Sequence, residues 1–283
     1  MRAETRRLLG DRRAAVGAGI LAVAALAALL APLLAGDPIV QRDIVATRFL
    51  PPLATDPLGA FHLLGTDRFG RDVWARLVYG ARVSLGVGTL AVVLSVMVGV
   101  AVGAAAGFWR GWIGVTLLGV TDFALALPRV VLLLLLASLW QPSAGLVIVV
   151  LGLTGWMTIA RLVYAEVRGL AGRPFVESAV GLGAPGMRIL ARHIMPNALT
   201  PVIVAAALGL GNAILLEAGL SFLGLGVQPP TPSWGNLIAS GRDTLINAPW
   251  VAAAPGVALV LVVVAATLLG DAVRDRLDPG KVG

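Results

Sequence analysis

The residue types that most often carry catalysis or bind metals are scarce in this chain of 283 residues. It has no cysteine and two histidines, His62 and His193, which excludes thiolate metal sites and Cys nucleophiles. The single lysine, Lys281, lies near the end of the sequence, so no Walker-type phosphate loop can be built. A Gly-x-Ser-x-Gly elbow and a two-histidine zinc motif are also missing. These absences predict a chain that is not itself an enzyme and holds no metal or other cofactor.

Two carboxylates, Asp122 and Glu217, lie within long apolar runs. In a bilayer such a carboxylate costs on the order of 3 kcal/mol unless it faces protein, water or a partner. Asp122 is therefore expected to face inward, either lining a pathway for a cationic substrate group or gating it, or making an interhelical hydrogen bond. Glu217 is nearer the end of its run and is expected either to line the mouth of the pathway or to lie hydrated at the interface.

One conspicuously polar stretch, residues 173–197, separates two apolar runs and reads RPFVESAVGLGAPGMRILARHIMPN. Pro174 suits the first turn of a helix, Gly183 can adopt the left-handed conformation that ends it, and Pro185 can open a second helix. The stretch therefore predicts two short helices at an angle. The second would present an apolar face that can dock into a groove on a partner, formed by Met187, Ile189, Leu190 and Ile194, with Arg188 and Arg192 elsewhere on its surface.

The elements that must position these residues are membrane helices. The chain is 58% hydrophobic and 13% charged, with a mean hydropathy of +0.90, far from the composition of soluble domains. An apolar run of about 20 residues can cross the hydrocarbon core as a helix. Six runs qualify and predict an all-α, polytopic membrane protein with about six transmembrane helices: 14–35, 83–107, 113–140, 143–160, 198–220 and 250–270.

The basic residues predict the orientation of these helices. With the N-terminus inside, the inner segments carry 14 Lys and Arg residues and the outer segments seven, so both termini are expected in the cytoplasm. The first run is too long for a cleaved signal peptide and is expected to be retained. The predicted organisation is a cytoplasmic segment 1–13, a first helix 14–35, an extracytoplasmic loop 36–82, a five-helix core 83–270 with a cytoplasmic loop 161–197, and a cytoplasmic tail 271–283.

Glycines recur every four residues in the second run, at Gly99, Gly103 and Gly107. This spacing places them on one face of the helix, where another backbone can approach closely in lipid. The stripe is interpreted as a helix-packing surface.

The polar stretch resembles a known family motif. Glu177, Ser178, Ala179 and Gly183, followed by Pro196, resemble the Glu-Ala-Ala loop of ABC importer permeases, with Ser178 in place of one Ala. In that family the loop forms coupling helices that insert into the ATP-binding subunit. By this resemblance Met187, Arg188, Arg192 and His193 belong to the same ATPase-coupling loop, and His193 is expected to make a helix-end contact.

Further segments narrow the resemblance. Residues 62–86, residues 217–236 and the closing helix with its tail are similar to the second, C-type permease of dipeptide, oligopeptide and nickel importers. The resemblance implies a type I importer permease fold in a bacterial or archaeal plasma membrane. It also implies transport of peptides or a related small solute such as a nickel chelate, in a heterodimer with a B-type permease. Two cytoplasmic subunits would bind ATP and Mg, and an extracytoplasmic binding protein would deliver the substrate.

By the same resemblance the outer segment 229–250 would help receive the binding protein. The long outer loop is expected to belong to the same surface, with a purely structural cap as the alternative, through the part that contains Gly65, Thr66, Asp67, Gly70, Arg71 and Asp72. Nothing in the sequence predicts a nucleic-acid partner, and the basic balance is explained by membrane orientation. The alternatives from other classes are an ATP-independent secondary transporter or channel, which would need more inward-facing charges than Asp122 and Glu217, and a structural membrane protein without transport activity.

Overall fold

The structure is a computed structural model that describes residues 12–41, 43–109 and 111–277. Most of the predicted N-terminal segment, Arg110 and Lys281 lie outside the described residues. Its elements, in chain order, are α2 (Arg12–Leu29), α3 (Ala31–Leu34), α4 (Ile44–Thr47), β1 (Ala54–Thr55), β2 (Phe61–His62), α5 (Val73–Phe108), α6 (Trp112–Ala126), α7 (Arg129–Ser138), α8 (Ala144–Ala171), α9 (Pro174–Gly181), α10 (Gly186–Ile189), the π-helical turn η1 (Leu190–Ile194), α11 (Met195–Ala198), α12 (Thr200–Phe222), α13 (Trp234–Arg242) and α14 (Trp250–Leu277).

The prediction of an all-α, polytopic fold is confirmed. Within the described residues, five helices are long and apolar enough to cross a membrane, namely α2, α5, α8, α12 and α14. Three of them are longer than the apolar runs predicted, because hydropathy detects the membrane-crossing part of a helix and not its polar ends. Helix α14 continues to Leu277 instead of 270. Helix α5 begins at Val73 instead of 83, where the Asp72 carboxylate accepts a hydrogen bond from the Ala75 N–H, and α8 continues to Ala171 instead of 160.

The third predicted span is not one straight helix. It is broken into α6 and α7, which meet at an angle of 87°. Pro128 supplies the physical reason, because a proline has no N–H to donate and disfavours helical backbone at the preceding residue. Leu127 and Pro128 are extended accordingly, with ψ of 134° and 111°. Counted as one broken span, the pair brings the total to six.

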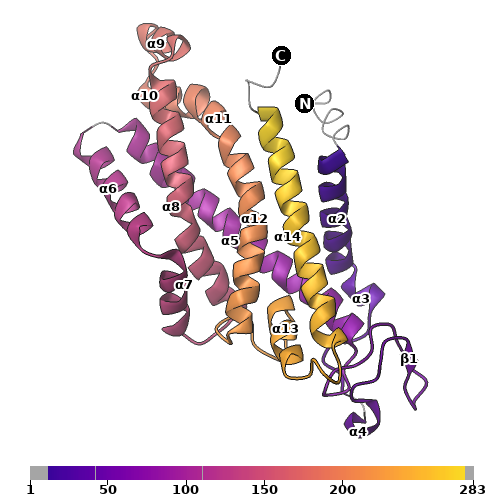
Figure 1. The fold of residues 1–283 in the computed structure, drawn as a ribbon. Coiled ribbons are helices and arrows are strands. Elements are labelled where there is room, and N and C mark those ends of the chain that lie inside the picture. Colours follow the sequence, from indigo (N-terminus) through magenta and orange to yellow (C-terminus); the bar gives the residue numbers. More distant parts are fainter. Residues whose placement is uncertain (1–11, 42, 110, 278–283) are drawn as a thin grey trace.

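The helices form a single bundle (Figure 1) in which α5 runs obliquely behind α8, α12 and α14. With 36 residues, α5 is about 54 Å long, well over the thickness of the hydrocarbon core, so a tilted path is expected. Its glycine stripe packs against α8 as predicted. A Cβ on Gly99 would lie 2.7 Å from Cβ of Ile159, and one on Gly107 would lie 2.9 Å from Cβ of Val167.

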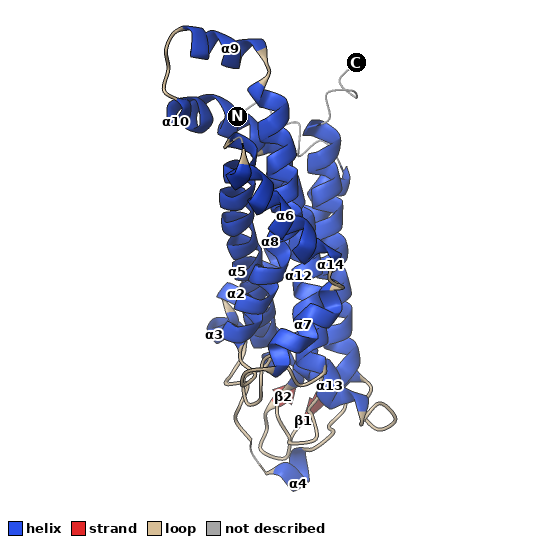
Figure 2. Cartoon of the chain, turned by 90° about the vertical axis from the view of Figure 1, so that its left-hand side faces the viewer, coloured by secondary structure: helices blue, strands red, loops and turns tan. Residues whose placement is uncertain are grey.

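The two ends of the bundle differ. At one end the chain forms a small cap from α3, α4, the antiparallel pair β1–β2 and the loops around them, and Figure 2 shows this cap below the helices. At the other end α9 and α10 project beyond the bundle, on the same side as the described ends of α2 and α14 (Figures 1 and 2). The polar stretch and both described ends therefore share one side of the membrane.

Candidate functional site

The projecting segment, α9 through α11, has the local geometry predicted from its prolines and glycine. Pro174 lies in the first turn of α9, where its missing N–H leaves no hydrogen bond unmade. Gly183 follows the helix with φ of +75°, a left-handed conformation that side chains with a Cβ avoid. Pro185 is the N-cap residue of α10. The two short helices therefore form as expected, and we call residues 174–198 the projecting loop.

The apolar face predicted for the second helix is turned inward. Ile189, Leu190 and Ile194 are buried in a cluster with Val163 and Val167 of α8. They attach the projecting loop to the bundle, so they are not free to dock into a partner. The prediction was wrong for these residues because periodicity reveals an apolar face but not which surface covers it.

The other predicted loop residues lie mostly on the outer face of the projecting loop. The Ser178 hydroxyl donates to the Pro174 carbonyl at 2.8 Å, and the His193 carbonyl accepts from the Asn197 side chain at 2.8 Å. Glu177, Ser178, Gly183, Met187, Arg188, Arg192 and Pro196 are exposed, His193 is half-buried and Ala179 is buried.

Three large apolar side chains on the same outer face, those of Phe175, Val180 and Leu182, were not predicted, whereas Met187 was predicted as part of an apolar docking face. Phe175, Val180 and Leu182 are 42%, 59% and 88% exposed, and Met187 is 58% exposed. No ion pair joins the charged side chains of this loop to other residues within the described parts of the chain. Exposed apolar residues flanked by free charges are typical of a protein-binding surface. The signal in the sequence was Leu182, an apolar residue directly before the helix-ending Gly183.

A second feature is a cavity of about 270 Å³ between α5, α7, α8 and α12. Each of three helices lines it mostly with apolar residues: α5 with Ala91, Val92 and Ser95, α8 with Leu151, Gly155, Thr158 and Ile159, and α12 with Ala205, Ala206, Leu208, Gly209, Asn212 and Ala213. Asn212 lies 12 residues into α12, about 18 Å along the helix, so the cavity is near the middle of a hydrocarbon core about 30 Å thick.

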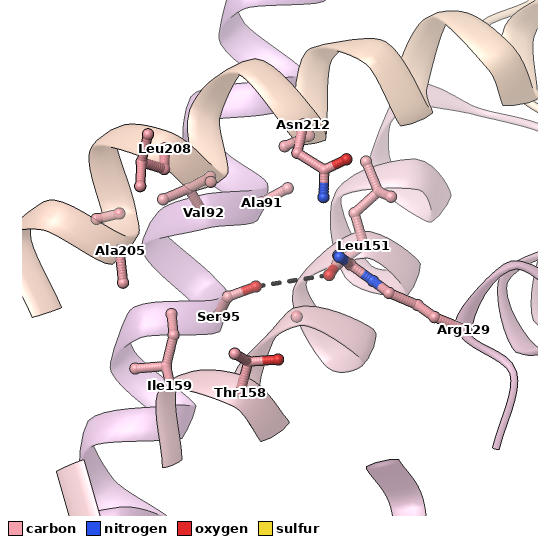
Figure 3. A pocket seen from close by; sticks show the side chains of 14 residues that line it. Ala91, Val92, Ser95, Arg129, Leu151, Thr158, Ile159, Ala205, Leu208 and Asn212 are labelled. Atoms are coloured by element: carbon pink, nitrogen blue, oxygen red, sulfur yellow. Dashed lines mark hydrogen bonds between the residues drawn. The ribbon is translucent and has the colours of Figure 1, made fainter. Parts of the chain in front are cut away.

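Figure 3 shows the guanidinium of Arg129 reaching into this cavity from the start of α7. Ser95 is already engaged, since its hydroxyl donates to the Gly152 carbonyl at 3.1 Å. The sequence pointed to Asp122 as a possible cavity residue and did not identify Arg129 as one. The signal was the neighbouring Pro128, because the break at Pro128 redirects the side chain that begins the next helix.

Asp122 does not line this cavity. It contacts Arg161 of α8, with 2.8 Å between Asp122 Oδ1 and Arg161 Nη1, although the N–H group is not aimed at that oxygen. The two side chains are 40% and 59% exposed, so the contact is screened and modest in energy. An interhelical contact was one of the two roles expected for Asp122, and a role in a pathway stays a prediction.

Glu217 neither lines an open mouth of the pathway nor lies hydrated at the interface, the two alternatives expected from the sequence, because it is 0% exposed. Its Oε1 accepts a hydrogen bond from Ser221 at 2.7 Å, and its carboxyl lies beside the hydroxyls of Ser84 and Ser233. Ser84 also accepts from the N–H of Trp234 at 3.1 Å. The carboxyl thus lies where α5, α12 and the start of α13 meet, a structural position that hydropathy could not distinguish from an interfacial one.

The cap at the opposite end contains a buried charge network. The Asp67 carboxylate accepts hydrogen bonds from the Arg71 backbone N–H at 3.0 Å and from its Nε at 2.8 Å, and lies 3.8 Å from Arg76 Nε. His62 Nδ1 lies 2.7 Å from Oδ2 of Asp72. Asp67, Arg71 and Arg76 are 2%, 6% and 2% exposed. Their burial favours the structural alternative for this part of the outer loop.

The outer segment after α12 contains the short helix expected there, α13. Ser233 and Asn236 form a reciprocal capping box at its start, which satisfies two N–H groups that a helix end leaves free. The Trp234 indole N–H donates to the Leu77 carbonyl of α5 at 3.1 Å. These bonds fix α13 at the capped end of the bundle, beside the lower ends of α12 and α14 in Figure 1.

The arrangement favours conduction and docking over catalysis. The described residues contain no group of three or more His, Asp or Glu side chains that could hold a metal ion. The cavity combines one cation with uncharged polar and small apolar groups, a lining that can contact a solute but contains no pair of acid and base.

Comparison with known proteins agrees with this geometry. Residues 99–282 match the family described as the binding-protein-dependent transport system inner membrane component. Residues 3–52 match the N-terminal transmembrane domain of oligopeptide transport permease C.

Curated relatives match almost the whole chain. A peptide transport system permease protein of Brucella abortus is 40% identical over 97% of this chain and 90% of its own length. A dipeptide transport system permease protein of Alkalihalophilus pseudofirmus is 36% identical, covering 97% and 88%, and a di/tripeptide permease protein of Pseudomonas aeruginosa is 39% identical, covering 89% and 83%.

Among solved structures, a chain of the MetNI methionine ABC transporter in an inward-facing conformation matches with a TM-score of 0.57. The match covers 72% of this chain and 96% of that one, at 20% identity. At this identity the likeness shows the fold alone, which is that of an ABC importer permease.

Proposed function

The chain belongs to the family of binding-protein-dependent transport-system inner membrane components, in its C-type peptide permease branch, and from this premise we propose that it forms half of a translocation pathway for peptides. It is a transport subunit, not an enzyme. The relatives named as dipeptide and di/tripeptide permeases support peptides as the substrate class. A nickel chelate has no such support here.

The proposed assembly has a second, B-type permease beside this chain, two cytoplasmic subunits that bind ATP and Mg, and an extracytoplasmic binding protein. The cavity between α5, α7, α8 and α12 would then form part of the pathway. The cap and α13 would face the binding protein. In this arrangement both termini are cytoplasmic, on the side of the projecting loop, as the excess of basic residues favours.

The observation that carries the proposal is the outer face of the projecting loop. It extends beyond the membrane helices (Figure 2) and exposes Phe175, Val180, Leu182 and Met187 to solvent. Its inner face is attached to α8 through Val176, Ala179 and Ile194. One face of the projecting loop therefore packs against the bundle, and the other exposes an apolar surface. This arrangement would allow an ATPase subunit to bind the exposed face and transmit its movement to the bundle. ATP-driven movement of that subunit would move α8 and, with it, one wall of the cavity.

The test replaces Glu177 by Ala and Gly183 by Val in the complete transporter. Glu177 is exposed on the outer face, and a branched residue at the left-handed Gly183 position costs about 1–2 kcal/mol of local strain. We expect both variants to insert into the membrane normally while losing ATPase association or coupled transport. Gly183→Asn, which tolerates that conformation better, should retain more coupling than Gly183→Val. Unchanged ATPase association and transport in the Glu177→Ala, Gly183→Val double variant would refute the proposal.

A further inference from the structure

Arg129 is a cation at membrane depth that the chain leaves unpaired. It begins α7 directly after the break in the third span and lines the central cavity. Among the described residues it has neither an ion pair nor a hydrogen bond, and neither Asp122 nor Glu217 lines the cavity. A charged side chain in a membrane helix is costly, and it usually faces a partner or a water-filled pathway.

The guanidinium of Arg129 reaches the opposite wall of the cavity, although the residue as a whole is exposed. A Cβ on Gly155 of α8 would lie 3.5 Å from Arg129 Nη2, so the side chain spans from α7 to the wall that α8 forms. A side chain at position 155 would first clash with the hydroxyl oxygen of Ser95. Figure 3 shows the Arg129 side chain aimed at the region between Leu151 and Asn212.

Two further polar groups of the cavity are also free to bond. The carboxamide of Asn212 and the hydroxyl of Thr158 line it, and neither is hydrogen-bonded within the described segments of the chain. Ser95, in contrast, uses its one hydroxyl proton on the Gly152 carbonyl. Asn212, Thr158 and Arg129 thus offer hydrogen-bond donors from three different helices, α12, α8 and α7, around one volume of about 270 Å³.

The hydrogen-bond donors of Arg129, Asn212 and Thr158 favour binding of an anion in the cavity. A guanidinium presents a planar fork of N–H groups that matches a carboxylate in bidentate geometry. An uncharged amide or hydroxyl adds donors without adding a competing negative charge. No acidic residue lines the cavity, so its net charge is positive and a cationic group would be repelled.

We propose that Arg129, with Asn212 and Thr158, forms a subsite for the terminal carboxylate of the transported solute as it passes through the membrane. This assignment rests on the proposed peptide-permease function. It adds that the pathway contacts a negatively charged group of the peptide. The break at Pro128 has a role in it, because it brings the start of α7, and therefore Arg129, to the cavity wall. The carboxylate would occupy this subsite only transiently. A single charged hydrogen bond binds weakly enough for the peptide to be released.

The test uses proteoliposomes that hold the complete transporter with its binding protein, supplied with dialanine or with dialanine amide. For Arg129→Gln we expect ATP-driven uptake of dialanine to fall about tenfold, the effect of losing one charged hydrogen bond. Uptake of the amide should change less than about twofold. Arg129→Lys keeps the charge and should restore part of the dialanine uptake. Arg274→Gln, at an exposed arginine on α14, is the matched control and should leave both substrates unaffected.

A second readout does not depend on transport. Phenylglyoxal modifies arginine side chains, and mass spectrometry can follow Arg129 and Arg274 separately. Dialanine should slow the modification of Arg129 at least threefold, dialanine amide should not, and Arg274 should react equally in all samples.

The outcomes separate the two proposals. Equal losses of dialanine and amide uptake in Arg129→Gln, or no protection of Arg129 by dialanine, would overturn the carboxylate subsite. Absence of any ATP-driven peptide uptake by the unaltered transporter would instead overturn the proposed function, and protection of Arg129 by dialanine would then still support the subsite as a binding site.

Discussion

The charged residues at the two ends of the bundle differ in burial and in pairing. In the cap, Asp67 bonds Arg71 and contacts Arg76, His62 contacts Asp72, and these side chains are almost all buried. In the projecting loop, Glu177, Arg188 and Arg192 are exposed, and no ion pair between described residues involves them. The cap pairs these charges with one another, although the Nε and Nη1 atoms of Arg76 have no hydrogen bond within the described residues, whereas the loop presents its charges to solvent. Internally paired charges are consistent with a structural role for the cap. Exposed charges without ion pairs are consistent with a role for the projecting loop in binding another protein.

The largest effect is expected when the negative charge of Asp67 is removed from the cap. Asp67→Asn leaves Arg71 and Arg76 buried without their counter-charge, which should lower the free energy of unfolding by about 3–5 kcal/mol. Thermal unfolding of the purified chain in detergent measures this loss. Asp37→Asn is the control, because Asp37 is exposed and accepts a hydrogen bond that an Asn side chain can also accept. Equal stability of the two variants would contradict an internally held cap.

At the other end, Leu182→Asp should leave stability unchanged and weaken partner binding. Leu182 is 88% exposed, so the isolated chain loses little when it becomes polar. Burying an aspartate in an apolar protein interface should reduce association with the ATPase subunits by about 10- to 100-fold. Co-purification at graded ATPase concentrations gives the affinity. Val45→Asp is the matched control, since Val45 is 86% exposed on α4. An equal loss of ATPase affinity in Val45→Asp would contradict the view that only the projecting loop binds the ATPase subunits.

The smallest expected effect concerns pH and the cap. Backbone N–H groups of Ala60 and Leu58 donate to Asp56 at 2.7 and 2.9 Å, and the Ala60 bond contributes most to a pKa below the usual value for an aspartate. Because the pKa is lower in the folded state, the ionised group stabilises the fold above its unfolded pKa near 3.9, and this contribution is lost as pH falls through the lower folded value.

Melting temperatures measured between about pH 6 and pH 3 should therefore fall less steeply in Asp56→Asn than in the unaltered chain. The asparagine can still accept from Ala60, which keeps the turn intact. Parallel melting curves for the two proteins would show that Asp56 does not contribute to acid sensitivity.

Much of the fold could be predicted because apolar length alone identifies a membrane helix. The six runs, the glycine stripe facing α8 and the helix-ending Gly183 all follow from local rules. Hydropathy could not show that α5 extends through polar residues to Val73, because that extension depends on the Asp72 cap.

The site was harder to predict because it depends on which faces meet. Ile189 and Ile194 look like a docking surface until α8 is seen to cover them. Glu217 looks interfacial until three serines from different segments surround it. Arg129 became a cavity residue only through the 87° break beside it. The first two facts depend on contacts between segments distant in sequence, which periodicity does not report, whereas the third depends on the size of a local break that Pro128 only indicates.

The most direct test of the difference between the two ends uses the absence of cysteine from the chain. Single substitutions Leu182→Cys in the projecting loop and Leu58→Cys in the cap, where Leu58 is 64% exposed, would each be treated with a membrane-impermeant maleimide. We predict that the first reacts only from the cytoplasmic side and is protected when the ATPase subunits are bound. The second should react only from outside, with or without them. Labelling of the Leu182 position from outside, or equal labelling with and without the ATPase, would contradict the account.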